Sequence, residues 1–266
     1  MNRPLVMGII NVDDDSFYAA SRHTEPDDVV ETAQKMVLAG ASIIDIGGQS
    51  TRPGSLQYTA DEEAERVIPA IECVHKALPQ AIISVDTYYS AVARQAVQVG
   101  ASIINDVSGG SLDDDMFPTV ADLRVPYILM HMQGTPVNMQ LNPQYEDVTR
   151  EVLDYFIQKL AVLRSMSIHD IIIDPGFGFG KTIQHNFTLL KNLETFKILE
   201  CPLLVGISRK STIYKTLGTT ADHALNGTTV LNTIGLLNGA QILRVHDVQE
   251  AVEAVKLVEQ YRGKSK

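Results

Sequence analysis

The chain has 266 residues, which suits one α/β barrel of about 250 residues or two small domains. With 45% hydrophobic and 20% charged residues, it has the composition of a globular protein with a substantial core. The formal net charge of −10 argues against a nucleic-acid-binding protein, which normally presents a basic face. We therefore expect no nucleic-acid partner. An anionic small molecule is still allowed, because local charge decides its binding.

The chain begins with a short apolar run at residues 5–10, followed by no small-residue cleavage site, so it does not resemble a signal peptide. No stretch approaches the roughly 18 apolar residues of a membrane span. Cys73 and Cys201 lack metal-ligand spacing and are expected to be buried, unreactive thiols. We expect a cytoplasmic protein without a membrane partner, with one domain at 1–262 and a solvated tail at 263–266.

Short apolar runs rich in β-branched residues recur along the chain. They lie at residues 5–10, 42–46, 82–85, 102–104, 127–130, 171–173, 203–207 and 242–245. Continuous apolar runs of this length are typical of parallel strands that are buried on both faces.

Segments with helical spacing separate the apolar runs. The clearest are residues 27–38, 61–78, 146–166 and 248–258. The first of them places these apolar residues on one face: Val30, Ala33, Met36 and Val37. Three similar phrases, AGAS at 39–42, VGAS at 99–102 and NGAQ at 238–241, put a glycine directly after a helix and lead into a strand. Eight strands alternating with helices predict a single (β/α)8 TIM barrel, and an open doubly wound sheet is the alternative.

Every predicted strand ends in polar or charged residues. In chain order they are Asn11, Asp45, Asp86, Asn105, His131, Asp174, the segment 208–210, and Arg244 with His246. One such residue is readily explained as a capped turn, and we favour that interpretation for Asp45 and Asp106. All eight together predict an active site at the C-terminal ends of the barrel strands.

The residue types at this rim suit a flat polar ring that carries a phosphate ester. Asp86, Asn105 and Asp174 can hydrogen-bond along the edge of a planar heterocycle. The groups suited to an anion are Arg52, Lys210, Arg244 and His246. Asn11 offers an oxygen ligand for Mg2+, which usually accompanies diphosphates. The glycine-rich turns at 47–54 and 174–181 do not match G-x-G-x-x-G, so no dinucleotide site is predicted.

Several segments resemble the dihydropteroate synthase family, in the family's order. The longer ones are MGIINV at 7–12 with DSF at 15–17, DIGGQSTRPG at 45–54, DPGFGFGK at 174–181, and SRKS at 208–211 with RVHD at 244–247. Three shorter matches are SVDT at 84–87, NDVSGG at 105–110 and MHMQG at 130–134. Any one would be weak, but seven in register across the whole chain are highly specific.

The resemblance implies an enzyme of folate biosynthesis and a target of sulfonamides. It would condense (7,8-dihydropterin-6-yl)methyl diphosphate with p-aminobenzoate, giving 7,8-dihydropteroate and pyrophosphate. The diphosphate would depart before the arylamine attacks the pterin cation, with Mg2+ as cofactor. The resemblance also implies a homodimer, for which the apolar residues of 225–237 are candidates.

The resemblance assigns roles to individual residues. The pterin would be bound by Asp86, Asn105, Asp174, Lys210 and Arg244, with Arg244 stacked under the ring. The diphosphate would be bound by Asn11, Thr51, Arg52, Arg244 and His246, and the metal ion by Asn11. The p-aminobenzoate pocket would comprise Phe17, Thr51, Pro53, Phe179, Lys210 and Ser211. The catalytic residues would be Asp15, Asp174 and Lys210, while His131 would support its neighbours.

The chain departs from the family pattern in its first two loops. Asp13 and Asp14 replace the usual Thr-Pro, which puts the function of that loop in question. Gln49 stands where many members carry Glu, and we expect little effect because the amide keeps the hydrogen bonding. Two other functions are considered: a pterin-binding barrel for methyl transfer from a folate, and a ligand-binding protein without turnover. The former would not need the SRKS segment or residues 50–54.

Overall fold

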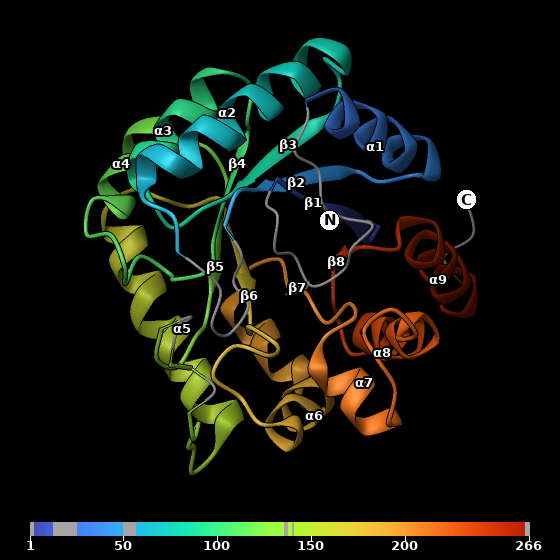
Figure 1. Ribbon diagram of the computed structural model, residues 1–266. Coiled ribbons are helices and arrows are strands. Elements are labelled where there is room, and N and C mark those ends of the chain that lie inside the picture. Colours follow the sequence, from blue (N-terminus) through green and yellow to red (C-terminus); the bar gives the residue numbers. More distant parts are fainter. Residues whose placement is uncertain (1–2, 13–25, 50–56, 136–137, 140, 264–266) are drawn as a thin grey trace.

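The protein is a closed barrel of eight parallel strands surrounded by helices, as Figure 1 shows for the computed structural model. The structure describes residues 3–12, 26–49, 57–135, 138–139 and 141–263. The strands are β1 (Leu5–Asn11), β2 (Ile43–Gly47), β3 (Ile82–Asp86), β4 (Ile103–Asp106), β5 (Tyr127–Met130), β6 (Ile171–Asp174), β7 (Leu204–Val205) and β8 (Ile242–Val245). The helices are α1 (Pro26–Ala39), α2 (Ala60–Ala77), α3 (Ser90–Gln98), α4 (Met116–Leu123), α5 (Val148–Ser165), α6 (Ile183–Lys191), the 3-10 helix η2 (Leu193–Leu199), α7 (Ser211–Leu217), α8 (Leu225–Leu237) and α9 (Val248–Tyr261).

The ends of the sheet meet, which makes it a barrel. The strand order is β6-β5-β4-β3-β2-β1-β8-β7, and every neighbouring pair is parallel. A parallel bridge from Ile173 of β6 to Leu203, just before β7, joins the two edges. Ile173 also donates its backbone N–H to Pro202 O at 2.9 Å. The predicted (β/α)8 barrel is confirmed, and the open-sheet alternative is wrong.

All eight predicted strands are present, but the seventh is much shorter than expected. The sequence pattern extends over 203–207, whereas only Leu204 and Val205 form the ladder to β8. Both residues are fully buried, like the neighbouring Leu203 and Ile207. An apolar run therefore marks burial on both faces, while the length of the ladder is decided by where the partner strand runs.

The helix predictions hold with small shifts. On α1 the buried positions are Val29 and Ala33, whereas Val37 is exposed, so the predicted face is rotated. The glycine in second place in each similar phrase has positive φ as expected: 104° at Gly40, 126° at Gly100 and 107° at Gly239.

The two cysteines correct a further expectation. Cys73 and Cys201 are free thiols, but both are only partly buried rather than enclosed in the core. Among the helices of the described residues, none has the length and apolar content of a membrane-spanning segment.

One carboxylic acid is enclosed between α2 and the sheet. Glu63 has no exposed surface. Gly48, directly after β2, lies so close that a Cβ there would be 3.1 Å from Glu63 Cγ. Burial raises the pKa of Glu63 to about 8, and the nearby Asp86 carboxylate adds to the rise, so the folded chain keeps this acid protonated at neutral pH.

This proton makes stability depend on pH. Because the folded state holds it more tightly than the unfolded state, the free energy of unfolding falls as the pH rises from about 4.5 towards about 8. We predict that Glu63→Gln removes this loss, so that the variant gains on the order of a few kcal/mol over the wild type between pH 4.5 and pH 8.5. Urea unfolding at both pH values measures the difference. The exposed Glu65→Gln on the same helix is the control, and equal pH profiles for both variants would contradict the prediction.

Candidate active site

A polar layer lies in the barrel interior directly above an apolar one. The apolar layer takes one residue from each of seven strands: Met7, Ile43, Ile103, Ile128, Ile172, Leu204 and Ile242. Side chains two residues apart along a strand point to the same face. Two residues beyond members of the apolar layer stand Asp45, Asn105, Asp174, Gly206 and Arg244. The polar groups therefore meet at the C-terminal mouth, on a floor of aliphatic side chains.

Arg244 is the centre of this layer. Its Nε donates to Asp45 Oδ2 at 2.6 Å, and its Nη2 donates to Asp86 Oδ2 at 2.5 Å. Asn105 Nδ2 also donates to Asp45 Oδ2, at 3.1 Å. Residues from β2, β3, β4 and β8 thus share one hydrogen-bond network across the barrel.

The network fixes a charged group in a poorly solvated place. Burial by itself would lower the pKa of Arg244, but attraction to Asp45 and Asp86 outweighs it and raises that pKa. Burial raises the pKa of Asp86 to about 7, although the Arg244 guanidinium opposes the rise. Arg244 therefore stays charged, and Asp86 can change its protonation state near neutral pH.

Lys210 and Asp174 form the second charged group of the mouth. Lys210 Nζ donates to the carbonyl oxygen of Phe177 at 2.6 Å and lies 4.5 Å from the centre of the Phe179 ring. Asp174 Oδ1 accepts the backbone N–H of Gly176 at 2.8 Å. Burial lowers the pKa of Lys210 to about 8, with Asp174 opposing. Burial raises the pKa of Asp174, with Lys210 opposing.

Gly206 leaves room beside these groups. A Cβ at this position would lie 3.6 Å from Asp174 Oδ2 and 3.9 Å from Arg244 Cβ. A larger side chain would project into the space between the carboxylate and the arginine. The missing side chain therefore keeps the wall between β6 and β8 open to a ligand.

His246 is a neutral hydrogen-bonding group. Its backbone N–H donates to Ser208 Oγ at 3.2 Å, and Ser208 Oγ lies 3.0 Å from its Nδ1. Ser208 and the imidazole therefore share one hydrogen bond, whose direction depends on the tautomer of the ring. Burial lowers the pKa of His246 to about 3, and Arg244 adds to the effect. The imidazole can therefore donate one hydrogen bond without adding positive charge.

Arg209 has a different task from the lysine that follows it. It is 4% exposed and makes a bidentate ion pair with Asp247, through Nε at 2.9 Å and Nη2 at 2.7 Å. Its Nη1 donates to the carbonyl oxygens of Ala221 and Asp222. The arginine thus joins the loop after β7 to the one after β8, which explains why both contain charged residues in their motifs.

Asp45 and Asp106, both predicted to cap turns, have different roles in the structure. Asp106 does stabilise a turn, because it accepts hydrogen bonds from the backbone N–H groups of Ser108 and Gly110, both at 2.7 Å. Asp45 does not, since its Oδ2 accepts hydrogen bonds from the side chains of Arg244 and Asn105. The sequence does contain a signal for this role. Asp45 follows Ile43 by two residues, as Asp174 follows Ile172, so both aspartates face the barrel interior.

Gln49 makes two hydrogen bonds to the backbone, so its replacement of Glu matters more than expected. Its Nε2 donates to Tyr58 O at 2.7 Å, while its Oε1 accepts from Tyr58 N at 3.2 Å. A carboxylate could accept the second hydrogen bond but could not donate the first. The amide therefore connects the two sides of the segment 50–56 in a way that glutamate at this position would not.

Other predicted site residues lie at the rim or outside the described part of the chain. Asn11 ends β1 beside Gly47 of β2, and Ser211 begins α7 next to Lys210. His131 is buried and contacts Lys181 rather than the Arg244 network. The predicted site residues outside the described part are Asp15, Phe17, Thr51, Arg52 and Pro53, as are Asp13 and Asp14.

Comparison with known proteins gives consistent matches over nearly the whole chain. The family model of pterin-binding enzymes matches residues 7–246. The dihydropteroate synthase of Escherichia coli strain K12 is 44% identical over 261 residues, which covers 97% of this chain and 92% of that protein.

Solved structures agree with the sequence matches. The dihydropteroate synthase of Yersinia pestis in complex with a sulfonamide drug has a TM-score of 0.95 at 40% identity, and the match covers 98% of this chain and 95% of that one. The synthase of Xanthomonas albilineans in complex with 7,8-dihydropteroate has a TM-score of 0.85 at 35% identity, covering 98% and 93%.

The Arg244 network makes a prediction about stability. Asp45→Asn removes one of two carboxylates around a buried guanidinium, so we expect the free energy of unfolding to fall by about 3 kcal/mol. The control is Asp122→Asn, whose partner Arg94 is 43% exposed, and there the loss should stay below about 1 kcal/mol. Urea titration of both variants provides the comparison, and similar losses would show that Asp45 does not hold Arg244.

Proposed function

Because the chain belongs to the pterin-binding enzyme family of dihydropteroate synthases, we propose that the mouth of its barrel is the active site for this family's reaction. It condenses (7,8-dihydropterin-6-yl)methyl diphosphate with p-aminobenzoate, and it releases 7,8-dihydropteroate and pyrophosphate. The chain is thus a transferase of folate synthesis. The observation that carries the proposal is the network in which Asp45 and Asp86 hold Arg244 above an apolar floor.

The polar layer suits the pterin ring. Asp86, Asn105 and Asp174 supply acceptors and donors for the N–H and C=O groups along the ring edge, and Lys210 adds a donor. Arg244 is fixed by two carboxylates before any ligand arrives, which favours stacking of its planar guanidinium on a flat ring. We therefore assign the pterin to the space between Asp86 and Asp174.

The diphosphate is assigned to the rim of the same mouth. Arg244 and the neutral His246 supply donors from β8 and the residue after it, and we expect Thr51 and Arg52 to add to them. A neutral imidazole can donate one hydrogen bond without placing a further positive charge at the rim.

Mg2+ is proposed at the same rim, bound by the amide oxygen of Asn11. Within the described residues, no three His, Cys, Asp or Glu side chains are grouped as ligands of a metal ion. This donor chemistry suits Mg2+, which often keeps waters and binds substrate phosphates with few protein ligands. When bound, the ion would supply positive charge for the departing diphosphate.

The reaction then needs charge stabilisation more than a protein nucleophile. As the C–O bond breaks, its electron pair leaves with the diphosphate, towards the cations of the rim. Asp174 offsets the positive charge that develops on the pterin, and Asp15 is expected to help. The amine nitrogen of p-aminobenzoate forms the new C–N bond and then loses a proton.

The arylamine is assigned to the side of the mouth formed by the loops after β6 and β7. The ring of Phe179 lies against Lys210, and Ser211 follows at the start of α7. The aromatic ring and the lysine suit a flat benzoate, with its apolar face and its charge. Phe17, Thr51 and Pro53 are expected to complete this pocket. A sulfonamide should compete for it, as the Yersinia pestis complex suggests.

The test of this function is pyrophosphate release by the purified protein. Release should require the pterin diphosphate, p-aminobenzoate and Mg2+ together, and EDTA should abolish it. Lys210→Met should lower turnover by about 100-fold or more, because it removes a cation of the site, while the exposed Lys191→Met should not.

A failure of pyrophosphate release would point to one of the two other functions considered from the sequence. Pterin binding without release would favour the ligand-binding protein, and consumption of a methylated folate would favour the methyl-transfer barrel. Similarity to a synthase over 97% of the chain favours neither. The cytoplasmic location stays a prediction from the sequence.

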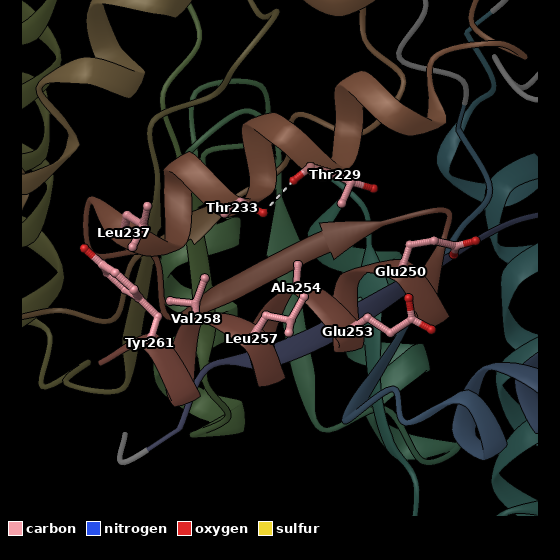
Figure 2. Close-up of a pocket in the computed structure, with 9 residues that line it drawn as sticks. All are labelled: Thr229, Thr233, Leu237, Glu250, Glu253, Ala254, Leu257, Val258 and Tyr261. Atoms are coloured by element: carbon pink, nitrogen blue, oxygen red, sulfur yellow. Dashed lines mark hydrogen bonds between the residues drawn. The ribbon is translucent and has the colours of Figure 1, made fainter. Parts of the chain in front are cut away.

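We also propose that the protein is a homodimer joined through α8 and α9. Both helices carry exposed apolar side chains at helical spacing: Val230, Ile234 and Leu237 on α8, and Leu257 and Tyr261 on α9. Between the helices lies a groove in which Leu237, Leu257, Val258 and Tyr261 gather, as Figure 2 shows. An exposed apolar face of this kind on two adjacent helices is typical of an interface between subunits.

Light scattering coupled to size-exclusion chromatography tests the dimer. The wild type should have twice the chain mass of 29.2 kDa, and Leu257→Glu should have the single mass, because it places a charge in the interface. Leu38→Glu, on the exposed side of α1, is the matched control and should stay dimeric. A wild type of single mass would contradict the proposal.

A further inference from the structure

Lys181 is a buried cation outside the Arg244 network. It follows the glycine-rich turn after β6 and is 3% exposed. Its Nζ donates to three carbonyl oxygens, those of Gly176 at 3.0 Å, Phe179 at 3.0 Å and His131 at 3.2 Å. His131 Nδ1 lies 2.9 Å from the same nitrogen. One ammonium group therefore joins the loop after β5 to the loop after β6.

The two loops are pressed together backbone to backbone. Gly176 and Gly180 have positive φ values of 70° and 60°. A Cβ at Gly176 would lie 1.9 Å from the carbonyl oxygen of His131, and a Cβ at Gly180 would lie 2.3 Å from that of Gln133. Only glycine allows this approach. The approach also brings three carbonyl oxygens around one point, where they would repel each other without a hydrogen-bond donor between them.

Lys181 can donate hydrogen bonds whether or not it carries a charge. Burial lowers the pKa of Lys181 to about 7, with Asp174 opposing. Burial also lowers the pKa of His131 to about 2, so the imidazole is neutral, and Nδ1 shares the at most three N–H groups of Lys181 with the three carbonyl oxygens. Within the described part of the chain, all the hydrogen bonds of Lys181 Nζ go to these two loops.

The loop that Lys181 holds is the one that positions Lys210. Phe177, between two of the bound carbonyls, offers its own carbonyl oxygen to Lys210 Nζ at 2.6 Å. Gly178, with φ of 84°, packs against the stem of Lys210, since a Cβ there would lie 3.1 Å from Lys210 Cδ. The Phe179 ring lies under the Lys210 ammonium group. A shift of this loop would therefore move both the lysine and the aromatic wall.

We propose that Lys181 is a positioning residue for the arylamine side of the site. By binding the carbonyl oxygens of residues 131, 176 and 179, it holds the β6 loop where Phe179 forms a wall and Phe177 directs Lys210. Lys181 touches no substrate and acts through Phe179 and Lys210. The inference rests on the proposed synthase function, because that function places the arylamine beside Phe179.

The first test compares Lys181→Met with Lys191→Met, an exposed lysine ten residues further on. Lys181→Met should raise the KM for p-aminobenzoate by about tenfold. The dissociation constant of the pterin diphosphate should rise by a smaller factor than this KM, because Asp86 and Asn105 are on strands that Lys181 does not contact and only the β6 loop and Lys210 would shift. Lys191→Met should change neither. A lower melting temperature with an unchanged KM would show that Lys181 only stabilises the fold, and would overturn the proposal.

A double-mutant cycle tests whether Lys181 acts through Phe179. In a Phe179→Ala background the aromatic wall is already absent, so adding Lys181→Met should raise the KM for p-aminobenzoate by clearly less than tenfold, with Lys210 accounting for the remainder. Two independent effects that multiply would contradict the proposal. If Lys181→Met failed to fold, His131→Gln would replace it in the cycle, since it removes the imidazole contact and leaves the cation in place. His131→Gln should raise the same KM about threefold, and an unchanged KM would contradict the proposal.

Failure of the proposed function has a different signature. If the wild type and Lys191→Met both released no pyrophosphate, the synthase activity itself would be wrong. Calorimetric binding of p-aminobenzoate in the presence of pyrophosphate would still measure the role of Lys181. Weaker binding by Lys181→Met than by Lys191→Met would support it, and equal binding would refute it.

Discussion

Burial of the Arg244 guanidinium is the constraint on which the mouth of this barrel depends. A cation in this position is stable only because Asp45 and Asp86 share its charge and accept its N–H groups. The carboxylates in turn need the arginine, since burial alone raises the pKa of Asp86. The result is a set of charges that is already fixed before a ligand binds, so little reorganisation is needed during the reaction.

The cations of the strand ends divide into two groups by what they bind. Arg209 and Lys181 are almost completely buried and bind carboxylate or carbonyl oxygens of the protein. They join loops that follow neighbouring strands, and these loops carry the groups of the site. Lys210 and Arg244 are less buried and face the mouth. A residue that holds a loop in place can therefore stand next to a cation that faces the ligand, as Arg209 stands next to Lys210.

The protonation states of the ionisable groups differ between the bottom of the site and its rim. Burial raises the pKa of Glu63, behind Asp86, to about 8, so the acidic side carries less negative charge than a count of its carboxyl groups suggests. His246 at the rim is neutral. An anionic substrate therefore meets Arg244 and Lys210 without strong repulsion from below.

Local sequence determined the eight strands, the main helices and the rim on which the polar residues gather, because burial on both faces and helical spacing are visible in short windows. It also determined the type of chemistry, through residues such as Asp86, Asn105, Asp174 and Lys210 at strand ends. Tertiary structure alone decided which residues hold one another. The pairing of Asp45 with Arg244 spans 199 positions, and the carbonyl cluster around Lys181 comes from two loops 50 positions apart. Such contacts depend on barrel closure and on strand register, and neither is encoded in the neighbourhood of a single residue.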